Sequence, residues 1–109
     1  MAMKELNQEE FDDFIRQNKI AVIDFWAPWC MPCLALSPIL KELENEFDGV
    51  AFAKVNVDRN VDLARQFGIM SIPTIIIFVD GKEADRIIGL VPKEELRERV
   101  LTYSGSFSP

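Results

Sequence analysis

The segment IAVIDFWAPWCMPC, residues 20–33, decides the fold. Its first half, residues 20–26, is an apolar run rich in β-branched and aromatic side chains that only Asp24 interrupts, which predicts a strand buried on both faces. Its second half carries Cys30 and Cys33 at the point where the strand gives way to a helical pattern. We therefore expect a cysteine pair at a strand-to-helix junction.

The rest of the chain continues this alternation of strands and helices. A long helix follows the cysteines, with an apolar stripe formed by Leu36, Ile39, Leu40, Leu43 and Phe47. The other predicted elements are a helix from the Asn7–Glu10 capping box to about Gln17, a strand over 50–57, a short helix capped by Asn60, strands over 74–79 and 84–88 joined by an Asp80-Gly81 turn, and a helix from Pro92. Such an order predicts an α/β fold, with a mixed sheet and helices on both of its faces.

Length and composition limit the classes of protein. The chain has 109 residues, of which 49% are hydrophobic and 28% charged, which predicts a single domain over 1–109 with 104–109 as a loose tail. The net charge of −6 argues against nucleic-acid and anionic-membrane partners, which bind clustered Lys and Arg. No run approaches the roughly 18 apolar residues of a membrane span, and no signal-peptide pattern is seen, so a cytoplasmic protein is expected.

The sequence contains no histidine and only two cysteines. Catalysis by Cys-His or Ser-His pairs is therefore excluded, as is zinc bound through histidine. Two thiolates cannot supply four ligands for an iron–sulfur cluster or a zinc ion within one chain. We expect no metal and no other cofactor, and find no glycine fingerprint for binding NADPH.

Redox chemistry is the best interpretation of the pair at Cys30 and Cys33. The free N–H groups and partial positive charge of a helix N-terminus stabilise a thiolate, the form that attacks disulfides. Cys30 lies nearer that end and would be the nucleophile, while the more shielded Cys33 would resolve the mixed disulfide. Two other interpretations stay open: half of a zinc site completed by a second chain, and an inert structural pair.

Residues 24–33, with the sequence DFWAPWCMPC, resemble the active-site segment of thioredoxins. The similarity continues through the segments Pro38-Ile39-Leu40, Phe52-Ala53-Lys54-Val55-Asn56-Val57-Asp58 and Gly68-Ile69-Met70-Ser71-Ile72-Pro73-Thr74, and through Gly81 and Gly89. It covers nearly the whole chain in the right order. The resemblance implies the thioredoxin fold, with four strands in the order 2-1-3-4 and the third antiparallel, or five strands if residues 3–6 add one.

The resemblance also implies roles for individual residues. Asp24, whose pKa burial would raise, would accept the proton of Cys33, although a structural hydrogen bond or a solvated position would also suit it. Lys54 would lie on the neighbouring strand and pair with Asp24, unless its side chain points outward. Pro73 would follow a cis peptide bond and pack against the sulfurs, leaving the Ile72 backbone free to bind an extended substrate.

A mostly apolar rim around Cys30 is expected to bind substrate. Its members are Trp29, Met31, Pro32, Ile72, Gly89 and Leu90, with Trp26 more in the core than in the rim. Two positions depart from the usual thioredoxin pattern, because Met31 stands where glycine is usual and Leu34 where a basic residue is usual. Met31 stands between the cysteines, where residues influence the redox poise across this superfamily. Leu34 removes a positive charge beside the thiolate and enlarges the apolar surface.

The resulting hypothesis is a thiol–disulfide oxidoreductase that reduces protein disulfides. The family implies a monomer that a flavin-dependent thioredoxin reductase restores to the dithiol. Alternatives are a disulfide oxidase or isomerase of the same fold, a non-enzymatic protein-binding module and a dimer bridged by zinc. A glutaredoxin is disfavoured by Trp29 before the first cysteine and by the lack of a paired-glycine segment after Ile88.

Overall fold

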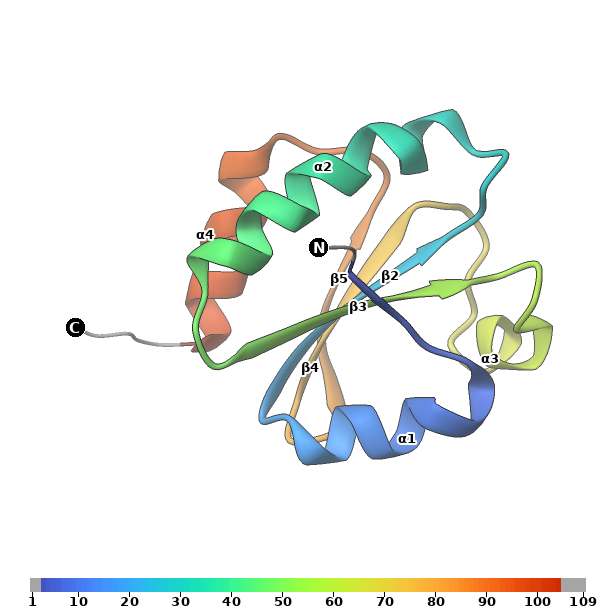
Figure 1. The fold of residues 1–109 in the computed structure, drawn as a ribbon, viewed down its shortest axis with the longest axis horizontal. Coiled ribbons are helices and arrows are strands. Elements are labelled where there is room, and N and C mark those ends of the chain that lie inside the picture. Colours follow the sequence, from blue (N-terminus) through green and yellow to red (C-terminus); the bar gives the residue numbers. More distant parts are fainter. Residues whose placement is uncertain (1–2, 105–109) are drawn as a thin grey trace.

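The computed structural model describes residues 3–104 and shows one sheet between two layers of helices (Figure 1). The elements are β1 (Lys4–Glu5), α1 (Gln8–Gln17), β2 (Ile20–Trp26), α2 (Met31–Glu46), β3 (Val50–Asn56), α3 (Val61–Gln66), β4 (Thr74–Val79), β5 (Lys82–Ile88) and α4 (Lys93–Ser104). Ser104 is thus the last residue of α4, whereas residues 105–109 of the expected tail lie outside the described residues.

The five strands lie in the order β1-β3-β2-β4-β5. Strands β1, β3 and β2 run parallel, and β4 and β5 are antiparallel to their neighbours. The expected four-strand order is therefore confirmed, and β1 adds the fifth strand through its pairing with β3. Strand β5 begins at Lys82, two residues before the predicted start, because the exposed edge positions carry no apolar alternation to reveal it.

The two faces of the sheet have separate apolar cores. Helices α2 and α4 cover one face, where Val22 and Ile77 of the sheet meet Leu36, Leu40 and Leu96. Helices α1 and α3 cover the other, where rings of α1, the sheet and the segment after α3 pack together: Phe11, Phe25, Phe67 and Phe78. Because side chains alternate along β2, Asp24 lies on the same face as Val22, toward α2.

Asn60 has a different role from the predicted one. It occupies the N-cap position of α3 but makes no capping hydrogen bond there. Its Oδ1 instead accepts the Gln8 N–H at the start of α1 at 3.0 Å, and its Nδ2 donates to the Asn56 carbonyl at 3.0 Å. The Asn60 side chain therefore joins the start of α3 to α1 and β3, and does not cap α3.

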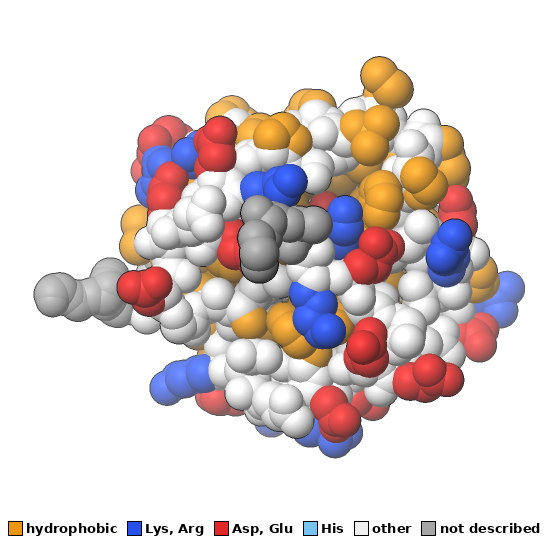
Figure 2. All heavy atoms as spheres, viewed as in Figure 1, with side chains coloured by type: hydrophobic (Ala, Val, Ile, Leu, Met, Phe, Trp, Pro, Cys, Tyr) orange, Lys and Arg blue, Asp and Glu red, His pale blue; other side chains and the backbone are white. Residues whose placement is uncertain are grey.

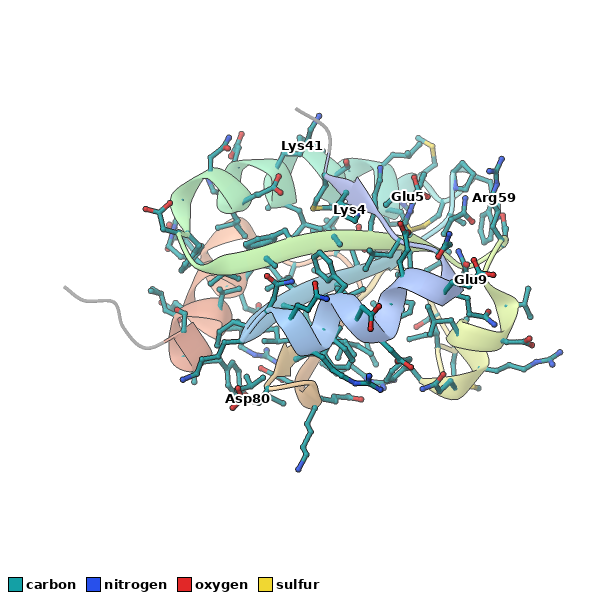
Figure 3. All side chains as sticks on the ribbon, turned by 60° about the horizontal axis from the view of Figure 1, so that its bottom comes forward. Lys4, Glu5, Glu9, Lys41, Arg59 and Asp80 are labelled. Atoms are coloured by element: carbon teal, nitrogen blue, oxygen red, sulfur yellow. A yellow bond between two sulfur atoms is a disulfide. The ribbon has the colours of Figure 1, made fainter. Side chains whose placement is uncertain are left out.

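The turns and loops between the strands lie at two opposite ends of the sheet. At one end, Asp80 and Gly81 form a tight turn with φ of 53° and 82°, and the Asp80 N–H donates to the Lys19 carbonyl. At the other end lie the C-terminal ends of β2 and β3, the start of β4 and the loop that carries Arg59; Figure 3 shows Asp80 and Arg59 at opposite ends. No helix within residues 3–104 has the length and apolar character needed to cross a membrane.

Candidate active site

The two cysteines form a disulfide at the N-terminus of α2, where the sheet ends. Cys30 is the N-cap residue of this helix and its Cα lies 5.2 Å from that of Cys33. Both side chains are buried, Cys33 more completely than Cys30. The expected strand-to-helix placement of the pair is thus confirmed.

The surroundings of the Cys30 sulfur favour negative charge. Its Sγ accepts the backbone N–H of Cys33 at 3.2 Å, the hydrogen bond that an N-cap side chain makes. The sulfur also lies at the positive end of a 16-residue helix. After reduction of the disulfide, both effects stabilise the thiolate of Cys30 over the thiol.

The loop before β4 covers the disulfide. The peptide bond between Ile72 and Pro73 is cis, as the resemblance implied, and the Ile72 carbonyl oxygen lies 3.8 Å from the Cys30 Sγ. The Pro73 carbonyl accepts the Gly89 N–H at 2.8 Å, and Thr74 Oγ1 donates to the Ser71 carbonyl. This loop and the segment after β5 therefore lie together beside Cys30.

Exposed apolar side chains surround this point. Figure 2 shows such side chains gathered over α2 and its N-terminal end. The exposed large ones include Trp29, Met31, Leu34, Met70, Ile88 and Leu90. Pro32 is also exposed, Ile72 and Gly89 are partly exposed, and Trp26 is half-buried against Cys30 and Cys33.

A shallow hollow of about 190 Å³ lies beside the disulfide. Its walls are mostly apolar and consist of Trp29, Val57, Ala64, Ile69, Met70, Ser71 and Ile72. The Trp29 side chain is held over it, because its Nε1 donates to Asp58 Oδ2 at 2.8 Å. The surface beside the Cys30 sulfur is thus apolar and partly concave.

Asp24 lies in β2, two residues before Trp26, and only 2% of its surface is exposed. Its Oδ1 has no hydrogen-bond partner within residues 3–104. Burial raises the pKa of Asp24 to about 7, against the opposing effect of the positive charge on Lys54. A carboxyl group with a pKa near neutrality can take up and release a proton under ordinary conditions.

Lys54 lies beside Asp24 in the sheet but does not form the expected ion pair. The two residues are direct partners in the parallel register of β2 and β3. The Lys54 Nζ instead lies 4.4 Å from the centre of the Trp26 ring, and within the described part of the chain no ion pair joins it to Asp24. Its charge acts on Asp24 through space, not by contact.

Two residues of this surface were not predicted from the sequence. Asp58 positions the Trp29 ring, and its own N–H is held by Asn56 Oδ1 at 2.9 Å. Met70 is almost wholly exposed in the loop before Pro73. Both lie within segments that resemble thioredoxins, but neither spacing nor periodicity distinguishes them. Within residues 3–104, no three His, Cys, Asp or Glu side chains are grouped to hold a metal ion.

Comparisons with known proteins agree with this geometry. The family model described as Thioredoxin matches residues 2–102. The thioredoxin of Staphylococcus saprophyticus is 44% identical over 99 residues, covering 90% of this chain and 94% of its relative. The thioredoxin of Chlamydia caviae is 46% identical over 102 residues, covering 94% of this chain and 99% of its relative.

Solved structures give the same result. A mutant thioredoxin from Halobacterium salinarum superposes with a TM-score of 0.89 at 32% identity, covering 99% of this chain and 95% of its own. A thioredoxin from Plasmodium falciparum superposes with a TM-score of 0.88 at 30% identity, covering 94% of this chain and 100% of its own.

Proposed function

Because this chain belongs to the thioredoxin family of protein-disulfide reductases, we propose that Cys30 and Cys33 divide the reduction of a substrate disulfide between them. The observation that carries this division is the position of the Cys30 sulfur, which accepts the Cys33 N–H at the start of α2 while Cys33 itself is buried. The less deeply buried and electrostatically favoured sulfur attacks, and the more shielded sulfur resolves.

The first step forms a mixed disulfide. The Cys30 thiolate attacks one sulfur of the substrate disulfide, the substrate S–S bond breaks, and the other substrate sulfur leaves as a thiolate that takes a proton from water. An extended substrate segment would lie against the Ile72 backbone and the apolar rim of Trp29, Met31 and Pro32. Gly89, held to Pro73, would leave room for that segment.

The second step frees the substrate. Cys33 loses its proton to the Asp24 carboxylate, and its thiolate attacks the Cys30 sulfur. The mixed disulfide bond breaks, and the second substrate sulfur leaves as a thiolate that takes a proton from water. Two electrons have then passed to the substrate, and the Cys30–Cys33 disulfide is the oxidised product. A pKa of about 7 suits Asp24 for this transfer, because the group is ionised often enough to accept and protonated often enough to return the proton.

The dithiol is restored by a reductase partner, for which we propose a flavin-dependent thioredoxin reductase. A monomer suffices, because both sulfurs of the exchange belong to one chain. We also propose a cytoplasmic location, where thiol systems keep a dithiol of this kind reduced.

The division of roles is tested by trapping. Cys33→Ser should attack substrate normally and remain bound to it, so that reduced variant mixed with insulin gives a disulfide-linked adduct on a non-reducing gel. Cys30→Ser is the matched control and should give none. An adduct from Cys30→Ser alone would reverse the roles, and partner binding that survives loss of both cysteines, with no adduct from either variant, would favour a binding module.

A further inference from the structure

Two methionines on the surface around the disulfide stand apart from the reaction described above. Met31 is 73% exposed and Met70 is 95% exposed, whereas Met3, in the core beneath α2, is 5% exposed. Met70 stands in the loop before the cis bond, and Met31 stands between the two cysteines. The exposed methionines of the described chain thus both lie beside the disulfide.

Their positions put both side chains where a bound substrate would lie. Met31 directly follows Cys30 and begins α2. Met70 lines the hollow with Trp29 and Ile72, and the Ile72 carbonyl is 3.8 Å from the Cys30 Sγ. A substrate segment that reaches Cys30 across this surface therefore contacts one or both thioethers. Flexible methionine side chains suit such a surface, because they adapt to apolar partners of different shapes.

The same side chains are open to oxidation by peroxides. In the reaction, the methionine sulfur attacks one peroxide oxygen, an S–O bond forms as the O–O bond breaks, and water leaves; the sulfur loses two electrons and becomes a sulfoxide. In the disulfide form no thiol competes, because the two cysteines of the sequence are bonded to each other. A sulfoxide is polar and chiral, and it disrupts contacts that rely on an apolar thioether.

We propose that Met31 and Met70 are a peroxide-sensitive part of the substrate-binding surface. Their oxidation weakens the binding of protein disulfides and leaves intact the thiol–disulfide exchange that Cys30 and Cys33 carry out. This inference rests on the proposed function, since it concerns the surface that would bind the substrate. It gives the protein a means of slowing protein reduction under peroxide that does not consume its cysteines.

The test treats the oxidised protein with hydrogen peroxide and then removes the peroxide. Peptide mapping by mass spectrometry should place added oxygen on Met31 and Met70 well before Met3. After reduction, kcat/KM for insulin should fall about fivefold, as expected for one or two lost apolar contacts, mainly through a higher KM. The rate with a small aromatic disulfide, which needs little of this surface, should stay within twofold.

Two variants complete the test, each compared with its own untreated sample. Met31→Leu/Met70→Leu should keep its insulin activity through the peroxide treatment. The same variant with Leu101→Met added carries an exposed methionine in the last turn of α4, at the far end of the molecule, and should gain oxygen without loss of activity.

Three results would overturn the inference: both sulfoxides formed with unchanged insulin kinetics, an equal loss in the double-leucine variant, or a parallel loss with the small disulfide. None of these depends on the outcome of trapping with Cys33→Ser. An untreated protein that failed to reduce insulin at all would instead contradict the proposed function.

Discussion

At the scale of single residues, the buried Asp24 carboxyl group should set the rate of the second step, in which it accepts the proton of Cys33. Asp24→Asn keeps the shape of the side chain but cannot accept a proton. Release of substrate from the Cys30 mixed disulfide should then slow by roughly a hundredfold, the low end of the range for a positioned general base. Stopped-flow measurement of this single step should show a wild-type rate that rises with pH through about 7, and a variant without that rise.

Asp12→Asn is the matched control for this substitution, because it removes an exposed carboxylate from α1, on the other face of the sheet. Its rate should follow the wild-type profile. Superimposable profiles of Asp24→Asn and wild type would remove Asp24 from the mechanism and leave it a structural role.

Lys54 offers an independent check through the same step. Its positive charge lowers the pKa of Asp24, so Lys54→Gln should raise that pKa above about 7. The rise in the release rate should therefore move to higher pH, while the plateau at high pH is kept. A positioning residue with no electrostatic effect would change the plateau and leave the midpoint where it is.

At the scale of the elements, Asn60 joins α1, β3 and the start of α3. Asn60 is 7% exposed, and Asn60→Ala would leave the Gln8 N–H without its side-chain partner and the Asn56 carbonyl with only the Arg59 N–H. We expect a loss of about 2 kcal/mol in the free energy of unfolding, because one partly buried donor is left unpaired and a second hydrogen bond is lost. Urea unfolding of the oxidised protein measures it, with the helical signal followed by circular dichroism.

Asn7→Ala is the comparison for this variant. Asn7 is exposed and caps α1, the helix whose first N–H Asn60 binds, by accepting the Glu10 N–H three residues along the chain. It should cost about 1 kcal/mol, as helix caps usually do. Asn60→Asp, which keeps the acceptor and loses the donor, should fall between wild type and Asn60→Ala. A smaller loss for Asn60→Ala than for Asn7→Ala would mean that the link between elements adds little.

Sequence patterns predict those elements whose signals are local. The strands 20–26 and 74–79 have the predicted bounds, because each is an apolar run that ends at a turn. The two-residue β1 has no pattern of its own and exists through its register on β3. The cap at Asn60 was assigned to α3 by its position, but its partner lies 52 residues away in the chain.

The candidate site divides in the same way. The cysteine pair at the start of a helix and the carboxyl group in an apolar strand are visible in the sequence. The hydrogen bond from Trp29 to Asp58, and the hollow shared by Trp29 and Met70, arise only when the loops after β2 and β3 and the loop before β4 meet. Their partners are set by the tertiary fold, so spacing along the chain does not reveal them.

At the scale of the whole molecule, the electrostatics of the fold have opposite effects on stability at different pH. The Arg97 and Lys93 side chains of α4 hydrogen-bond Glu46 of α2 and lower its pKa to about 2, and the hydrogen bond from Arg99 lowers the pKa of Asp85. Both carboxylates stabilise the fold at neutral pH and lose that contribution as the pH falls through the acid range. Asp24 acts in the other direction, because its pKa is raised.

The pH dependence of stability should therefore separate Asp24 from Glu46 and Asp85, whose pKa values are lowered. The unfolded chain releases the Asp24 proton near its ordinary pKa of 3.8, whereas the folded chain holds it to about 7. Stability from this residue thus falls as the pH rises from about 4 to about 7, and stays low above that range. The shift corresponds to a penalty of up to about 4 kcal/mol at pH 8.

Asp24→Asn should remove this penalty. Unfolding of the oxidised proteins at a series of pH values should show the variant to be more stable than wild type at pH 8 and nearly equal to it near pH 4. The contributions of Glu46 and Asp85 are common to both proteins and cancel in the difference, so its midpoint belongs to Asp24 alone. A difference that does not change with pH would mean that Asp24 is already ionised in the folded protein near pH 4. A loss of substrate release together with a gain in stability would show that the fold keeps a costly buried carboxyl group for its chemistry.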